Sequence, residues 1–229
     1  MWYRRRSIIF GLIFACGFML AGLVAVITNT PYVPGFVVIG LHMAGETGIN
    51  VTFTVALLFV LLCFIIRVWG SSYLQAALVW NADAKAEHLF VAGPFRYTRN
   101  PLYFGTMLMA IGIGSVGPPI AWAFIVIVSA VFTYFLIDHE EQLLRKRFSK
   151  AYHDYCSNVP RFWPRLRPAP QIGHITPSLR EGLRAEAFSG AMFLAMCALL
   201  VGPPAGLYAF FVIYAAGIVA QRMLVRRGA

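Results

Sequence analysis

The feature that most constrains this chain is a series of apolar runs, each close to the length of a membrane-spanning helix. A helix rises 1.5 Å per residue, so about 20 apolar residues cross the roughly 30 Å hydrocarbon core of a bilayer. Six segments fit this pattern to different degrees: residues 7–27, 51–69, 102–116, 119–137, 188–201 and 207–220. We therefore predict an all-α integral membrane protein with about six transmembrane helices.

The overall composition agrees with a membrane protein. Of the 229 residues, 59% are hydrophobic and only 12% are charged, whereas soluble domains carry about 25% charged residues. The mean hydropathy is +0.71. Such a chain has too little polar surface to fold as a water-soluble globule.

The distribution of charge predicts the orientation in the membrane, because short loops rich in Lys and Arg stay in the cytoplasm. With Arg4–Arg6 inside and six crossings, all 19 Lys and Arg residues fall on one side. We expect cytoplasmic termini, a cytoplasmic active site and residence in a bacterial inner membrane. The net charge of +10 then indicates attraction to anionic membrane lipids rather than to nucleic acid.

Cysteine usage gives no sign of a disulfide framework or a metal centre. Cys16, Cys63 and Cys197 lie in apolar runs, Cys156 lies in a segment expected in the cytoplasm, and no CxxC pair occurs. We predict no metal site.

Two polar stretches, residues 81–100 and 138–187, should hold the function. They suggest three regions: an N-terminal two-span region (1–80), a core with the cytoplasmic segments (81–170) and a C-terminal two-span hairpin (171–229). Within the second stretch, Leu144, Phe148, Tyr152 and Tyr155 recur at helical spacing, which predicts an amphipathic helix on the cytoplasmic face.

Glu140 and Glu141 stand at the head of this apolar stripe, so we expect both carboxylates to face protein rather than water. An unpaired charge there would be costly. The candidate partners are Arg96, Arg99 and Arg161, and one interpretation is a purely structural ion-pair cluster that joins the two polar stretches.

The ordered motifs in these stretches resemble one family. Residues 93–105 read GPFRYTRNPLYFG, the pair Glu140–Glu141 follows, and Val159-Pro160-Arg161 comes last. This set resembles the isoprenylcysteine carboxyl methyltransferases and related integral-membrane methyltransferases, over residues 88–164. The resemblance implies an enzyme that uses S-adenosyl-L-methionine.

Carried over by position, the resemblance implies a cytoplasmic-face pocket for S-adenosyl-L-methionine. The implied cofactor-binding residues are His88, Leu89, Phe90, Phe95, Asn100, Pro101, Tyr103 and Glu140. The residue types suit this cofactor, because its adenine stacks on aromatic rings and its cationic groups favour carboxylates and π faces.

The reaction that the resemblance implies is direct displacement at the methyl carbon, which depends on positioning and electrostatics. The candidate catalytic residues are Arg99, Glu141 and Arg161. A carboxylate acceptor needs only a cation to hold it, whereas an amine acceptor needs a base such as Glu141 or His139. We expect a lipophilic or lipidated acceptor that enters from the bilayer; its identity and the oligomeric state stay open.

Two departures from the family pattern bear on the acceptor. Asn100 stands where the family commonly has His, and Leu136 stands where the animal enzymes place an Arg that contacts substrate. Leu136 argues against a prenylcysteine carboxylate as the substrate and tilts slightly towards alternatives such as a phospholipid amine N-methyltransferase. A membrane reductase with a nicotinamide cofactor and a non-catalytic membrane protein with the same fold are also compatible with the pattern.

Three other features have interpretations unrelated to catalysis. The Gly112-x-Gly114-x-x-Gly117 pattern lacks a preceding strand, so it predicts helix packing and a turn rather than a dinucleotide site. Arg67 is interpreted as reaching towards lipid headgroups in preference to closing the cofactor pocket. His42 and Glu46 are expected to be solvated in an outer loop (28–50).

Overall fold

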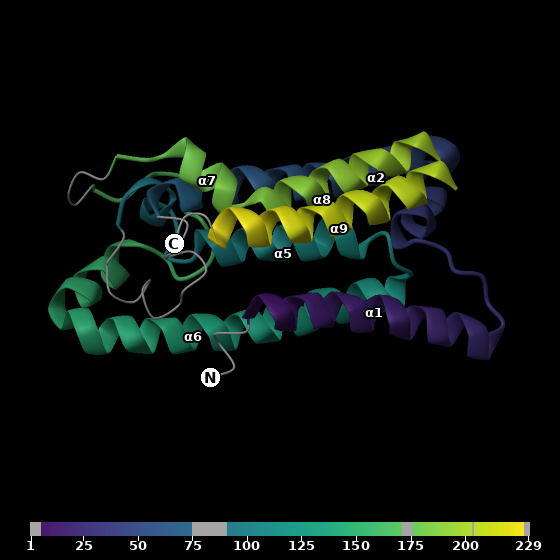
Figure 1. Cartoon of the computed structure of the whole chain (residues 1–229). Coiled ribbons are helices and arrows are strands. Elements are labelled where there is room, and N and C mark those ends of the chain that lie inside the picture. The colour runs from purple at the N-terminus through teal and green to yellow at the C-terminus, as the bar shows by residue number, and fades with distance from the viewer. Residues whose placement is uncertain (1–5, 75–90, 171–175, 203, 227–229) are drawn as a thin grey trace. The chain divides into compact units, whose positions relative to one another are not determined.

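The computed structural model describes residues 6–74, 91–170, 176–202 and 204–226. Within these ranges the chain forms helices joined by turns, and no strand occurs in them, which confirms the all-α prediction. In chain order the elements are α1 (Arg6–Thr28), α2 (Gly35–Tyr73), the 3₁₀ helix η2 (Gly93–Arg96), α5 (Pro101–Gly114), α6 (Pro119–Asn158), α7 (Leu179–Ala185), α8 (Ala187–Ala198), the 3₁₀ helix η3 (Leu199–Val201) and α9 (Ala205–Arg226) (Figure 1).

Four of the described helices, α1, α2, α6 and α9, are long and apolar enough to cross a membrane. The pair formed by α7 and the helix after it, bent by 66°, counts as a fifth candidate. With 14 residues, α5 is about 21 Å long at 1.5 Å per residue, less than the hydrocarbon thickness. The length and apolar character of these helices make the chain an integral membrane protein. The sixth span stays a prediction.

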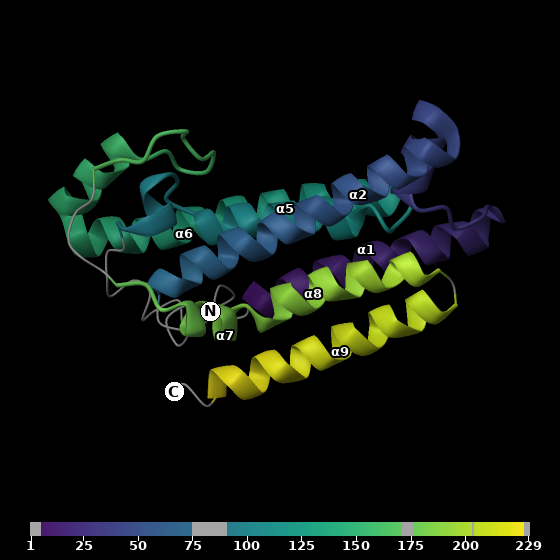
Figure 2. The same ribbon diagram turned by 90° about the horizontal axis from the view of Figure 1, so that it is seen from above.

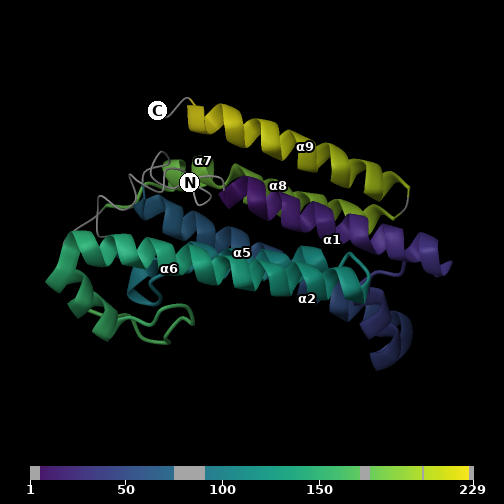
Figure 3. The same cartoon turned by 90° about the horizontal axis from the view of Figure 1, so that it is seen from below.

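The described residues group into two compact units, Met1–Leu62 with Thr106–Tyr134, and Cys63–Gly105 with Phe135–Ala229. In the first unit α1 packs along the beginning of α6 (Figure 3). The rings of Phe10 and Phe132 meet edge to face with centroids 5.0 Å apart. The end of α5 approaches α2 closely, because a Cβ at Gly112 would lie 2.6 Å from the Ala56 carbonyl oxygen. This packing confirms the interpretation of the glycine pattern.

The segment expected as an outer loop is largely helical. Helix α2 begins at Gly35, and its helical geometry breaks only at Ala44 and Gly45, where Gly45 has φ +60°. Glycine adopts this left-handed conformation without steric cost, so the helix folds back into a hook (Figure 2). His42 and Glu46 are exposed on the hook, as predicted.

In the second unit, α6 contains the predicted amphipathic helix. The helix breaks at Ser149, which has φ +37°, and changes direction there (Figure 1). On the inner face, Tyr152 and Tyr155 are buried with Val91, Val159 and Ala169, while Leu144 and Phe148 pack at the edge of this cluster. The predicted apolar stripe therefore faces a protein core.

The C-terminal hairpin consists of α8 and α9, which pack side by side (Figures 2 and 3). A Cβ at Gly217 of α9 would overlap the side chain of Ala191 on α8, so the two backbones come close together. The expected boundary at 80/81 lies outside the described ranges and the one at 170/171 lies at the end of a described range, and the three-region division stays a prediction.

Candidate functional site

The candidate site is built where the segment around η2 meets the segment after α6. Three backbone hydrogen bonds join them: Arg99 N to Pro160 O, Arg165 N to Tyr97 O and Ala169 N to Arg96 O, each 3.0 Å. The predicted Gly93-Pro94 turn is present, since Gly93 begins η2 with φ +57°. A side chain there would also overlap the ring of Tyr73. The turn therefore requires glycine.

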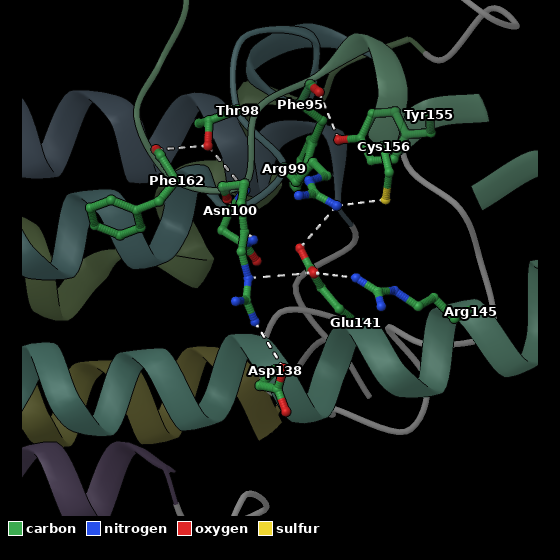
Figure 4. A network of polar contacts seen from close by, with 11 residues as sticks. Phe95, Thr98, Arg99, Asn100, Asp138, Glu141, Arg145, Tyr155, Cys156 and Phe162 are labelled. Carbon is green, nitrogen blue, oxygen red and sulfur yellow. Dashed lines mark hydrogen bonds and ion pairs between the residues drawn. The ribbon is translucent and has the colours of Figure 1, made fainter. Parts of the chain in front are cut away.

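Side-chain hydrogen bonds reinforce the junction. Thr98 Oγ1 donates to the Phe162 carbonyl oxygen at 2.9 Å, and Asn100 Nδ2 donates to the Arg161 carbonyl oxygen at 2.8 Å. The Tyr155 hydroxyl donates to the Phe95 carbonyl oxygen at 2.7 Å. Figure 4 shows the Thr98–Phe162 and Phe95–Tyr155 bonds on one side of the Glu141 side chain, close to Arg99. The fold thereby fixes the backbone that carries the candidate catalytic arginines.

Glu141 lies at the centre of a cluster of guanidinium groups, here called the arginine cluster (Arg99, Arg145 and Arg161 around Glu141). Its Oε1 lies 3.3 Å from Arg99 Nη1, and its Oε2 lies 3.4 Å from both Arg145 Nη2 and Arg161 Nε. The Glu141 side chain is only 3% exposed. Because a buried carboxylate requires compensating charge, the three guanidinium groups offset the cost of burying Glu141.

The arginine cluster extends through Asp138. Arg161 Nη2 lies 3.1 Å from Asp138 Oδ1, and Arg99 also contacts the Cys156 sulfur. Two of the three predicted cationic partners, Arg99 and Arg161, thus pair with Glu141. The third, Arg96, donates instead from Nε to the Ala169 carbonyl oxygen at 2.6 Å.

Next to the arginine cluster, the preceding carboxylate has a different partner. The Tyr103 hydroxyl donates to Glu140 Oε1 at 2.6 Å, and both side chains are buried. Tyr103 stands in the first turn of α5, and Asn100 precedes this helix. The adjacent carboxylates of α6 therefore sit in distinct surroundings, one bonded to a phenol and one to cations.

The remaining predicted cofactor-binding residues lie either in the core or outside the described ranges. Phe95 is buried with Leu74, Leu102 and Ala185, and Pro101 is fully buried at the start of α5. His88, Leu89 and Phe90 lie outside the described residues. The structure thus brings Asn100, Tyr103 and Glu140 close to the candidate catalytic residues, and the roles of all of them stay predictions.

A cavity of about 60 Å³ opens beside this site, lined by Val91, Arg96, Asp154, Tyr155, Asn158, Val159, Ala169 and Pro170. None of the predicted cofactor-binding residues lines it. Its volume suits one or two water molecules. The predicted pocket for the cofactor therefore stays a prediction.

Arg67 does not extend towards lipid headgroups, so that interpretation was wrong. Its Nε and Nη2 donate to the two carboxylate oxygens of Glu186 at 2.6 and 3.0 Å, and its Nη1 donates to the Leu102 carbonyl oxygen at 3.1 Å. Ser71 and Ser189 also donate to Glu186, which is 1% exposed. A buried carboxylate on the C-terminal hairpin was a stronger partner for this guanidinium than the membrane surface.

Sequence reasoning missed several residues of these clusters. Arg145 follows Glu141 by four residues, so helical spacing alone could have found this pair. Asp138 pairs with Arg161, 23 residues later in the sequence, and helical spacing does not indicate that pair. Glu186 is 119 residues from Arg67, and no local pattern points to such a distant pairing.

With the geometry described, the chain can be compared with known proteins. Residues 51–151 match the phospholipid methyltransferase family. This family of integral-membrane methyltransferases is related to the isoprenylcysteine carboxyl methyltransferases, so the resemblance deduced from the motifs is confirmed. The matched segment holds Arg99, Asn100, Tyr103, Glu140 and Glu141, while Arg161 and Glu186 lie beyond it.

No curated protein sequence and no solved structure matches the chain. The match to phospholipid methyltransferases supports a membrane methyltransferase, and it does not separate oxygen from nitrogen as the methylated atom. Across the described residues, no group of three or more His, Cys, Asp and Glu side chains is arranged to hold a metal ion.

Proposed function

We propose that the chain is an S-adenosyl-L-methionine-dependent methyltransferase that methylates a lipophilic acceptor at the cytoplasmic face of a bacterial inner membrane. The observation that carries this proposal is the buried Tyr103–Glu140 hydrogen bond beside the arginine cluster, within the segment that matches phospholipid methyltransferases. These phenol, carboxylate and guanidinium groups are the side-chain types that the proposed cofactor and the proposed acceptor require.

The polar side chains near the start of α5 suit the amino-acid end of the proposed cofactor. Glu140 supplies a buried carboxylate for an ammonium group, and Tyr103 holds that carboxylate in place through its hydroxyl. Asn100 adds an amide that is tied to the Arg161 backbone. When bound, S-adenosyl-L-methionine would supply an electrophilic methyl group on a sulfonium.

The arginine cluster fits the acceptor. Arg99 and Arg161 carry guanidinium groups that bind carboxylate or phosphate oxygens with two parallel hydrogen bonds. A lipidated carboxylate and a phospholipid headgroup each offer such an anion. In both cases these arginines would orient the acceptor, and Glu141 would keep their side chains in a fixed arrangement until the acceptor arrives.

The nature of the acceptor decides what else the site must do. A carboxylate attacks as it is, and no proton has to leave. An amine must first lose its proton, and Glu141 or His139 is the proposed base. Because both oxygens of Glu141 already contact guanidinium groups, this carboxylate would have to leave those partners to take a proton from an amine. That requirement disfavours Glu141 as the base and leaves His139 as the proposed base for an amine acceptor.

The decisive experiment is calorimetric titration of the detergent-purified protein with S-adenosylhomocysteine and, separately, with a reduced nicotinamide dinucleotide. Binding of the first alone supports the proposal. Binding of the second alone would favour a reductase, and binding of neither would favour a non-catalytic membrane protein.

The methylated atom can then be identified with a radiolabelled methyl donor and a total lipid extract. Methyl esters release labelled methanol in mild base, whereas methylated amines keep the label. Label that base releases indicates carboxyl O-methylation, and label that it does not release indicates N-methylation.

A further inference from the structure

The segment Phe162–Arg167, here called the tryptophan loop, exposes large apolar side chains beside cations. Trp163 is 74% exposed and Leu166 is 99% exposed. Arg165 and Arg167 stand on either side of Leu166 and are exposed as well. Two large apolar side chains beside two arginines form a small surface that is unfavourable in water and suited to a partner with both apolar and anionic parts.

The exposure does not result from a loosely held backbone. The loop is tied to the segment around η2 through Phe162 O, which accepts from Thr98 Oγ1, and Arg165 N, which donates to Tyr97 O. Ala169 N closes the loop by donating to Arg96 O. In addition, Arg165 Nη1 contacts the Asn158 carbonyl oxygen. The fold therefore presents Trp163 and Leu166 outward from a fixed frame.

Two contacts place the loop at the level where apolar helices end. The apolar run of α6 stops at Ile137, and the next residue, Asp138, pairs with Arg161 just before the loop. Phe104, in the first turn of α5, meets the Trp163 ring with centroids 6.1 Å apart. Ends of apolar helices mark the membrane–water boundary, where Trp side chains are enriched.

We propose that the tryptophan loop inserts into the headgroup region of an anionic bilayer on the side that holds the candidate site. Trp163 and Leu166 lie among the upper parts of the acyl chains, and Arg165 and Arg167 bind lipid phosphates. Apolar contact combined with cationic side chains is the general basis of binding to anionic membrane interfaces. The insertion would hold the arginine cluster at the depth where headgroups of lipophilic acceptors lie.

The test uses a variant in which Trp2, Trp69, Trp80 and Trp122 are replaced by Phe, so that Trp163 is the only tryptophan. It is reconstituted in nanodiscs of phosphatidylcholine with phosphatidylglycerol, with lipids brominated near the headgroup end of the chains or with iodide in the buffer. The expected result is strong quenching by bromolipid and weak quenching by iodide.

Two results would overturn the proposal. Strong iodide quenching without bromolipid quenching means that the loop faces water. Protection from both quenchers means that protein covers it, for example a second copy of the chain. If the fourfold variant does not fold, the bromolipid quenching lost between the natural chain and Trp163→Phe gives the same answer.

The charge contribution is tested separately with Arg165→Gln and Arg167→Gln combined. Quenching of Trp163 by bromolipid should be stronger in nanodiscs with phosphatidylglycerol than in pure phosphatidylcholine, and this difference should shrink at least twofold in the double variant. Arg180→Gln, an exposed arginine elsewhere, is the matched control and should keep the difference. An unchanged difference in the double variant would refute the phosphate contact.

Discussion

Arg67 binds both carboxylate oxygens of Glu186, at 2.6 and 3.0 Å, across 119 residues of sequence. The same guanidinium donates to the carbonyl oxygen of Leu102, the residue before Tyr103. A carboxylate from the C-terminal hairpin thus supports the start of α5. The hairpin, which lies outside the matched residues 51–151, is linked in this way to the candidate cofactor site.

The first prediction concerns this pair. Glu186→Ala should lower the free energy of unfolding by about 3–5 kcal/mol, because it leaves a buried guanidinium without its carboxylate. The measurement is thermal unfolding in detergent. Glu181→Ala is the control, since the Glu181–Arg184 pair is similarly close at 2.8 Å but more exposed, and it should cost about 0–1 kcal/mol.

A double-mutant cycle completes this test. Arg67→Met with Glu186→Met should be less destabilising than the sum of the two single changes, since no unpaired charge is then left. Additive effects would show that Arg67 and Glu186 act separately.

The second prediction concerns the two residues proposed to hold the cofactor. Tyr103→Phe removes the hydrogen bond to Glu140 but keeps the ring, and it should weaken binding of S-adenosylhomocysteine by about tenfold, corresponding to roughly 1.4 kcal/mol. Glu140→Gln removes the charge and should weaken binding more strongly. Both affinities are measured by calorimetry, with Tyr208→Phe as the control because Tyr208 is 71% exposed on α9. Unchanged affinity in both variants would refute the site assignment.

The third prediction ranks the arginines around Glu141 by burial. Their side chains are 12% exposed for Arg99, 32% for Arg161 and 64% for Arg145. Solvent screens an exposed ion pair, so Arg145→Gln should change the free energy of unfolding by less than about 1 kcal/mol. Arg99→Gln should cost about 3 kcal/mol or more because it uncovers a buried carboxylate. Thermal unfolding in detergent gives the order, and equal losses for both variants would contradict it.

The sequence predicted what depends on local pattern. Apolar run length predicted the all-α membrane architecture, and the spacing of Leu144, Phe148, Tyr152 and Tyr155 predicted the buried face of α6. The burial of Glu140 and Glu141 followed from their place at the head of that stripe. The pairing of Glu141 with Arg99 and Arg161 was one of a few possibilities that charge balance allowed.

What the sequence did not predict depends on long-range packing or on single backbone angles. Arg67 was expected near headgroups because nothing in its neighbourhood indicates Glu186. The hook in α2 depends on the conformation of Gly45, and the bend in α6 depends on Ser149. The tryptophan loop was expected only as part of a polar stretch. Its exposure depends on hydrogen bonds to residues about 65 positions earlier, and no local pattern indicates those contacts.

The last prediction concerns the Gly93 turn, which leads the chain into η2, ahead of Arg99 in the arginine cluster. Gly93 has φ +57°, and an added Cβ would overlap the Tyr73 ring. Gly93→Ala therefore combines backbone strain with a steric clash and should lower the free energy of unfolding by about 2 kcal/mol or more. Binding of S-adenosylhomocysteine should weaken as well, because Arg99 and Asn100 follow this turn in the chain.

The matched control is Gly11→Ala in α1, where a Cβ meets no atom within 4 Å and alanine is the better helix former. A Gly93→Ala protein as stable as Gly11→Ala would show that the turn does not need its left-handed conformation.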